Sequence, residues 1–147
     1  MSKRQTIFDA VKVRFATATT ANAYASNVGQ KVFEWQLVPV DLDNLPCSLL
    51  SDPIEEALID NKNTGAFVRQ LTIDASLLLA EVNQTAAKAR AALADVITAI
   101  GTDPRWGGLA LRTLPVSEEL KLDDEGERIS GVRLVFKIEY PREAWEA

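Results

Sequence analysis

The sequence contains no histidine and a single cysteine, Cys47, among its 147 residues. Without histidine, neither Ser-His-Asp nor Cys-His catalysis is available, and the commonest zinc ligand is missing. One cysteine allows no disulfide within the chain, so we expect a protein that folds in a reducing compartment. Because a nucleophilic thiol needs a neighbouring base, the short apolar stretch around Cys47 favours a buried structural cysteine.

Long apolar runs are also missing. The longest, such as residues 77–80, are far too short to cross a bilayer, and the N-terminus lacks the apolar stretch of a signal peptide. The formal net charge is −5, and such an acidic surface does not bind nucleic acid by neutralising its phosphates. The composition is 47% hydrophobic and 25% charged, which is typical of a globular domain. We therefore expect one domain, residues 1–147, with no cofactor, no metal and no membrane partner.

The first half of the chain is predicted to contain one helix and three strands. A capping box of Ser2 and Gln5 precedes apolar residues at helical spacing, which predicts a helix over residues 3–20. Alternating or short apolar stretches predict strands, and Pro53 is expected to end the second of them. The predicted strands are residues 32–40 with Trp35 on the buried side, residues 45–50 and residues 66–79, and a helical turn is expected over residues 55–60.

The second half contains the strongest helical pattern, which predicts a helix over residues 81–100 with Gly101 as its C-cap. Two extended stretches around a polar turn predict a closing hairpin. Its parts are an extended stretch at 109–122 interrupted at Pro115, a turn at 123–127, and a strand at 128–140 that Pro141 ends. The order of elements predicts an α+β fold, with a mostly antiparallel sheet of four to five strands and two main helices packed on one face.

A sheet covered on one face leaves the other face to solvent or to a partner, and both alternatives stay open. Residues on the wet side of the alternation, most of them polar, mark this free face. They are Arg69, Gln70, Thr72, Asp74 and Ser76 in one strip and Arg133, Val135 and Lys137 in another.

Acidic pairs and tryptophans are the remaining candidates for a site. General acid–base catalysis needs two carboxylates in a cleft. The pairs Asp41/Asp43, Glu55/Glu56, Glu118/Glu119 and Asp123/Asp124 instead fall in predicted turns and edges, where we expect solvated side chains. Trp and Arg are enriched at interface hot spots, although a tryptophan can equally fold back as a lid on the core. The candidate interface residues are Arg105, Trp106, Asp123, Asp124, Glu125 and Trp145.

Three stretches make the chain resemble the phage tail terminator (tail completion) proteins of long-tailed phages. They are the N-terminal helix leading into residues 32–36 and Leu45-Pro46, the strand 67–79 feeding the Ala-rich helix at 86–100, and the closing hairpin ending at 135–140. The resemblance implies a virion structural protein that forms a ring, usually a hexamer, by heterologous contacts. Such a ring caps the tail tube, stops polymerisation of the major tail protein and offers a surface to the head-side connector.

The resemblance also implies where the protein acts and what it does not do. It implies no catalytic residue, so we do not expect an enzyme, and DNA would pass through the lumen without specific binding. The protein would lie at the head-proximal end of the virion tail after assembly in the host cytoplasm. We hypothesise that the acidic turn 123–127 faces the lumen or a neighbouring subunit. The alternatives are a head–tail joining or neck protein of the same virion, a small α+β binding module unrelated to phage, and a metal enzyme that uses carboxylates.

Overall fold

The computed structural model describes residues 1–36, 38, 40–61, 66–80, 85–121, 129–143 and 145. The elements are α1 (Lys3–Phe15), the 3₁₀ turn η1 (Thr20–Asn22), β1 (Val32–Glu34), the 3₁₀ turn η2 (Leu42–Asn44), β2 (Cys47–Asn61), β3 (Ala66–Ala80), α2 (Thr85–Gly101), β4 (Arg112–Lys121) and β5 (Ile129–Glu143). Their order is the predicted one.

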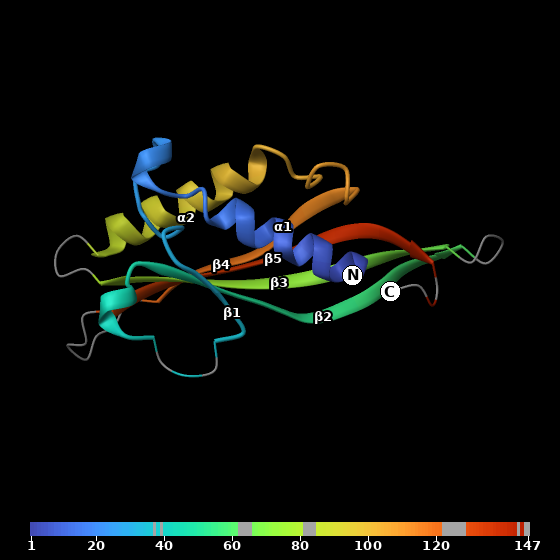
Figure 1. Cartoon of the computed structure of the whole chain (residues 1–147), viewed down its shortest axis with the longest axis horizontal. Coiled ribbons are helices and arrows are strands. Elements are labelled where there is room, and N and C mark those ends of the chain that lie inside the picture. The colour runs from blue at the N-terminus through green and yellow to red at the C-terminus, as the bar shows by residue number, and fades with distance from the viewer. Residues whose placement is uncertain are drawn as a thin grey trace.

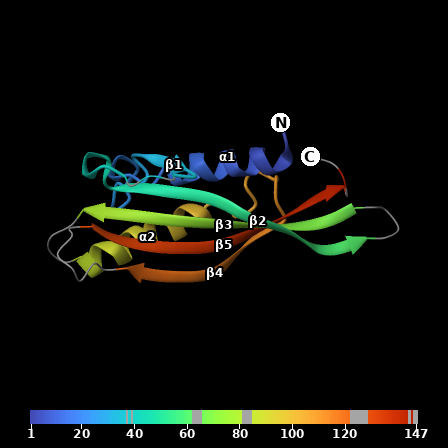
Figure 2. The same cartoon turned by 90° about the horizontal axis from the view of Figure 1, so that it is seen from below.

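One sheet and two helices make up the fold. The strands form a single five-stranded sheet in the order β1-β2-β3-β5-β4, in which only the pair β1–β2 is parallel. Both helices lie on the same face of this sheet (Figure 1), and the view from below looks onto the face that they leave uncovered (Figure 2). The predicted α+β class is confirmed.

Helix α1 begins as predicted but ends early. The backbone N–H of Gln5 donates to the Ser2 hydroxyl at 3.0 Å, which caps the first turn. The helix ends at Phe15 instead of residue 20, because the threonine-rich stretch that follows forms turns. There the Thr17 hydroxyl donates to a carbonyl three residues earlier, at 2.6 Å. Gly29 returns against this turn so closely that a Cβ would overlap the Phe15 carbonyl oxygen, which excludes every residue with a side chain.

Strands β1 and β2 differ most from the prediction. β1 has three residues and ends where Trp35 turns the chain with a φ of 49°. β2 has 15 residues and includes 55–60, so the helical turn predicted there is wrong. Pro53 does not end β2, because it lies at a shift in register between Ser51 and Ile54, where the ladder is irregular and needs no N–H from it. Pairing with β3 over the full hairpin overrides the local preference of this stretch.

The central strands β3 and β5 carry most of the core. Their predicted alternation is confirmed over residues 71–79 and 132–140, where every second residue is buried under the helices. These residues are Leu71, Ile73, Ala75, Leu77 and Leu79 in β3 and Val132, Leu134, Phe136, Ile138 and Tyr140 in β5. Pro141 does not end β5, which continues to Glu143 in register with β3. The Glu139 carbonyl accepts from Leu111 on the β4 side. The backbone nitrogen of Pro141, two residues further along β5, faces the same side. It lies beyond the start of β4, so no strand is present there to accept an N–H.

Helix α2 rests on the sheet through small residues, of which Ala89 and Ala99 are at most 1% exposed. Gly101 is the last helical residue and not the predicted C-cap. Carbonyls at this end also accept from the guanidinium of Arg14 in α1, whose Nη1 lies 3.1 Å from the Ala99 oxygen and 3.0 Å from the Asp103 oxygen. A cation at a helix C-terminus is favourable, so Arg14 ties the two helices together. The predicted first turn of α2, residues 81–84, lies outside the described residues.

Candidate interface on the open face of the sheet

The face of the sheet without helices carries paired charges. Arg133 of β5 and Asp74 of β3 form an ion pair of 2.7 Å, and Arg112 of β4 forms another with Glu139 of β5 at 2.6 Å. Gln70 adds a hydrogen bond from its amide to Glu139 at 3.3 Å. The hydrogen bond from Arg112 lowers the pKa of Glu139 although the carboxyl group is buried, so this group stays ionised. This face is therefore polar, and two ion pairs neutralise four of its charges.

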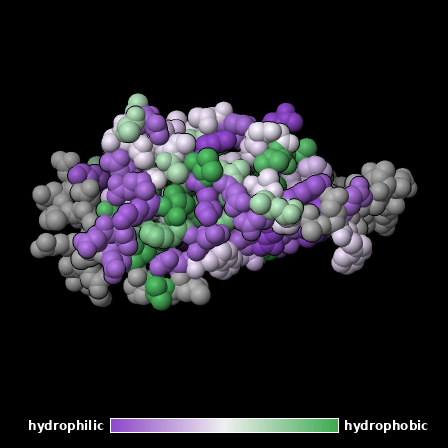
Figure 3. Space-filling view, viewed as in Figure 1, coloured by the Kyte–Doolittle hydropathy of each residue, from purple (hydrophilic) through white to green (hydrophobic). Residues whose placement is uncertain are grey.

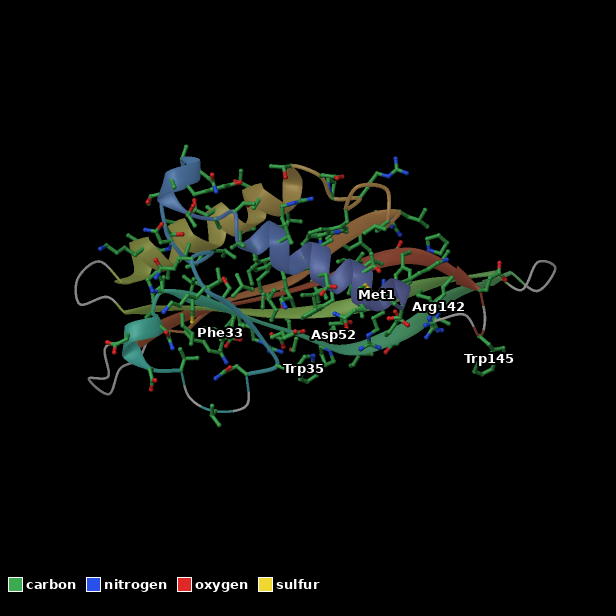
Figure 4. All side chains as sticks on the ribbon, in the orientation of Figure 1. Met1, Phe33, Trp35, Asp52, Arg142 and Trp145 are labelled. Carbon is green, nitrogen blue, oxygen red and sulfur yellow. The ribbon has the colours of Figure 1, made fainter. Side chains whose placement is uncertain are left out.

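Trp35 stands at the border of this face in a strained conformation. Its positive φ of 49° is rare for a bulky residue. The indole Nε1 donates to Asp52 Oδ1 at 2.8 Å, and Asp52 Oδ2 accepts from Arg4 Nε at 2.8 Å. Figure 4 shows Trp35 beside Asp52 near the middle of the molecule. The residue is 49% exposed, so the prediction of Trp35 as a core residue is wrong. The chain leaves the sheet at this residue, and its side chain is held at the surface.

A groove of about 320 Å³ lies beside Trp35 on the open face. Its polar lining comes from all four long strands and from the segment after β1. It includes Trp35, Gln36, Ser51 of β2, Asp74 of β3, Arg133 of β5 and Lys121 of β4. These side chains include one carboxylate and two cations, so the lining is net positive in a chain of net charge −5. An acidic group next to an aromatic one would fit this environment.

Trp145 is the most exposed large side chain of the candidate set. It is 99% exposed, and it lies near one end of the molecule, far from Trp35 along the longest axis (Figure 4). Hydrophobic areas on the side of the molecule shown in Figure 3 are small and separated by hydrophilic residues. A fully exposed tryptophan is unusual against such a surface, because its ring carries a large apolar area.

Trp106 is a lid on the core, which is the second of the two roles that the sequence left open for it. It is 2% exposed, stacks on Phe136 with centroids 6.5 Å apart, and lies under the Arg14 guanidinium at 4.6 Å. Its indole Nε1 donates to the Thr113 hydroxyl at 2.8 Å. Arg105, the residue before it, is exposed. The other candidates, Asp123, Asp124 and Glu125, lie outside the described residues.

A charged cluster on the helix face of the sheet was not predicted. Glu55 forms ion pairs with Arg142 at 3.2 Å and Arg69 at 3.4 Å and accepts from the Tyr140 hydroxyl, although its side chain is only 4% exposed. Burial and the neighbouring carboxylate raise the pKa of Tyr140. The prediction placed Glu55 in a solvated turn and Arg69 on the open face, and it ended the last strand at Pro141, before Arg142. Arg69 lies two residues before Leu71 in β3, so the alternation of the strand would have placed its side chain on the helix face. The cluster itself depends on pairing between strands that are distant in the sequence.

Other chemistry has little support in the part of the chain that the structure describes. No group of three or more histidine, cysteine, aspartate or glutamate residues suitable for a metal is found there. Among the described helices, none is long and apolar enough to cross a membrane. Cys47 is buried as predicted, and this burial raises the pKa of its thiol to about 11.

Comparisons with known proteins support the fold. No protein-family model matches the sequence, and no curated protein matches it. Among solved structures, the chain is similar to a chain described as belonging to the virion of a native gene transfer agent particle. The TM-score is 0.56 at 20% sequence identity, over 89% of this chain and 94% of that chain. At this identity the likeness shows a shared fold over nearly the whole length of both chains.

Proposed function

We propose that this chain is a structural protein of a phage-like virion, and that it forms a ring at the head-proximal end of the tail tube. In that position it ends tail polymerisation and offers the surface to which the head attaches. The protein acts through its outer surfaces and is not an enzyme.

The likeness to a gene transfer agent virion chain carries the proposal, because it covers 89% of this chain and 94% of the other. The whole domain is therefore matched, and not only a common hairpin or helix pair. The resemblance to tail terminators found in the sequence points to the same class of particle. A fold can host many functions, so the specific role depends on the surfaces of this chain.

Two unlike surfaces support a ring. One is the groove beside Trp35 on the open face, and the other is the surface at Trp145, which is 99% exposed. A heterologous contact joins different patches of successive subunits, and it closes into a ring when the rotation between subunits allows. The lining of the groove is net positive in a chain of net charge −5, which would leave the acid excess on other surfaces and suits a wall past which DNA slides without binding.

Electron microscopy of particles assembled without this chain tests the proposal. We expect tails of uncontrolled, excessive length, since nothing then stops addition of the tube protein. Tails of normal length that remain separate from heads would instead assign the chain to head–tail joining. Tails of normal length attached to heads would contradict any role at this junction. Complementation with the unaltered chain is the control.

The acidic turn around Asp123, Asp124 and Glu125 is part of the same proposal. Its excess of acid suggests that it faces the lumen or a neighbouring subunit, because transiting DNA must not adhere. Replacing all three with lysine should reduce infectivity or ring assembly. Unchanged assembly and infectivity would remove this role from the turn.

A further inference from the structure

The C-terminal segment around Trp145 and the groove beside Trp35 have complementary chemistry. The segment 143–147 carries Glu143, Trp145 and Glu146 and no basic residue. The groove carries the Trp35 ring, Lys121 and the Asp74–Arg133 pair, and its lining is net positive. We propose that segment 143–147 of one subunit docks in the Trp35 groove of the next subunit, with Trp145 as its apolar anchor. This inference names the subunit contact and rests on the ring of the proposed function.

The segment cannot reach the groove of its own subunit. Arg133 lines the groove and Glu143 ends the same strand, so ten residues of extended chain, about 33 Å, separate them. Trp145 lies only two residues beyond Glu143, which allows a return of about 7 Å. Figure 4 agrees, since Trp145 and Trp35 are well separated along the longest axis. Docking of Trp145 in the Trp35 groove therefore requires the groove of another copy of the chain.

The charge of the segment favours docking in this groove over docking in a more apolar pocket on the other side of β4. That second pocket, of about 260 Å³, lies between α2 and β4, where Ile97, Pro115 and Phe136 line it together with Glu118. The Glu118 carboxylate would repel the glutamates of segment 143–147. In the Trp35 groove, the same glutamates would meet Lys121 and Arg133, and the two indole rings can pack against each other.

The contact is heterologous, as a ring requires. Groove and segment lie at different places on the subunit, so each copy donates its segment to one neighbour and receives a segment from the other. Trp35 is suited to this role because Asp52 and Arg4 already hold its ring in place before a partner arrives. Little side-chain entropy then remains to be lost on binding.

Sedimentation of the full-length protein over a concentration series tests the contact. Truncating a central aromatic anchor weakens association by about 30-fold, so Trp145→Ala should raise the concentration of half-assembly by roughly that factor. Lys121→Glu and Glu146→Lys should each weaken assembly alone. An equimolar mixture of the two should restore it, because each acidic groove then faces a basic segment.

The matched control is Lys137→Glu, which alters a charge on the same face outside the groove lining. It should leave assembly within about twofold of the unaltered protein, because a charge at the edge of an interface contributes little. Assembly unchanged by Trp145→Ala, a mixture that fails to recover, or a protein that stays a single subunit at all concentrations would overturn the inference. Tail length in particles is a separate measurement, so a ring formed through other surfaces would refute this contact and leave the proposed function standing.

Discussion

Arg14 makes the most testable contribution to stability within the subunit. Its guanidinium lies among the carbonyls of Ala99, Ile100 and Asp103 at 3.0–3.3 Å and over the Trp106 ring at 4.6 Å, with 18% of the side chain exposed. Arg14→Met keeps the apolar stem and removes the cation. Nη1 has two hydrogens for three carbonyls, so about two hydrogen bonds are lost.

The expected loss is about 3 kcal/mol. Hydrogen bonds to a charged group contribute about 1.5–3 kcal/mol, and the contact with the aromatic ring about 1 kcal/mol. The two are not additive, and water can reach part of the exposed helix end. For a domain of this size, 3 kcal/mol corresponds to a decrease in Tm of about 10 °C.

Urea unfolding followed by far-ultraviolet circular dichroism measures this change. The midpoint should fall while the m-value stays constant, because the same surface is exposed on unfolding. Arg105→Met is the matched control, since Arg105 is exposed, and its change should stay within about 0.5 kcal/mol. If Arg14→Met were as mild as this control, the guanidinium would not cap α2 in solution.

Three further predictions concern the core and the open face. Gly29→Ala should cost about 2–4 kcal/mol in urea unfolding, since its Cβ would overlap the Phe15 carbonyl oxygen; a loss below 1 kcal/mol would contradict that packing. Cys47, whose pKa is raised to about 11, should react with a thiol reagent at pH 8 only after unfolding, and fast labelling of the folded protein would disprove its burial. Arg112 lowers the pKa of Glu139, so the ionised Glu139 carboxylate stabilises the fold above about pH 4.3. This contribution is lost on further acidification. The difference in unfolding free energy between the unaltered protein and Glu139→Gln should therefore shrink below pH 4.3, and a constant difference would refute the prediction.

The parts of the fold that sequence could predict are those with long, regular hydrophobic patterns. β3, β5 and α2 repeat apolar residues at period two or near 3.6 over many residues, so the buried face of each element could be predicted directly. β2 was mistaken because Pro53 and the acidic pair at Glu55 resemble the end of a strand, whereas pairing with β3 carries the strand through both. Its ladder depends on contacts between distant residues, which no local pattern contains.

The candidate site was predicted only in part for a similar reason. The polarity of the open face follows from alternation, and it was recognised at Asp74 and Arg133. The groove, however, needs β4 to lie beside β5 and the chain to leave the sheet at Trp35. An apolar residue at an alternating position normally indicates the core, and the positive φ that turns Trp35 outward has no signature in a tryptophan.

Trp35 and Trp106 share a left-handed backbone, with φ of 49° and 55°, yet they differ in what the subunit gains from them. Trp106 is 2% exposed, so burial of its ring offsets the strain within the subunit, and Trp106→Gly should cost at least about 3 kcal/mol. Trp35 leaves half of its ring in water, about 100 Å² that would contribute about 2.5 kcal/mol only when a partner covers it.

Trp35→Gly should therefore destabilise the subunit less than Trp106→Gly and weaken assembly strongly. The buried half of the ring contributes about 2.5 kcal/mol and the hydrogen bond to Asp52 about 1 kcal/mol, and glycine offsets about 1–2 kcal/mol of this loss by relieving the strain. Urea unfolding of the dilute subunit should show a loss of about 2 kcal/mol, while sedimentation should show assembly weakened by about 30-fold. A Trp35→Gly subunit as unstable as Trp106→Gly would mean that the strained ring stabilises its own subunit, and the reason for placing the interface at Trp35 would be gone.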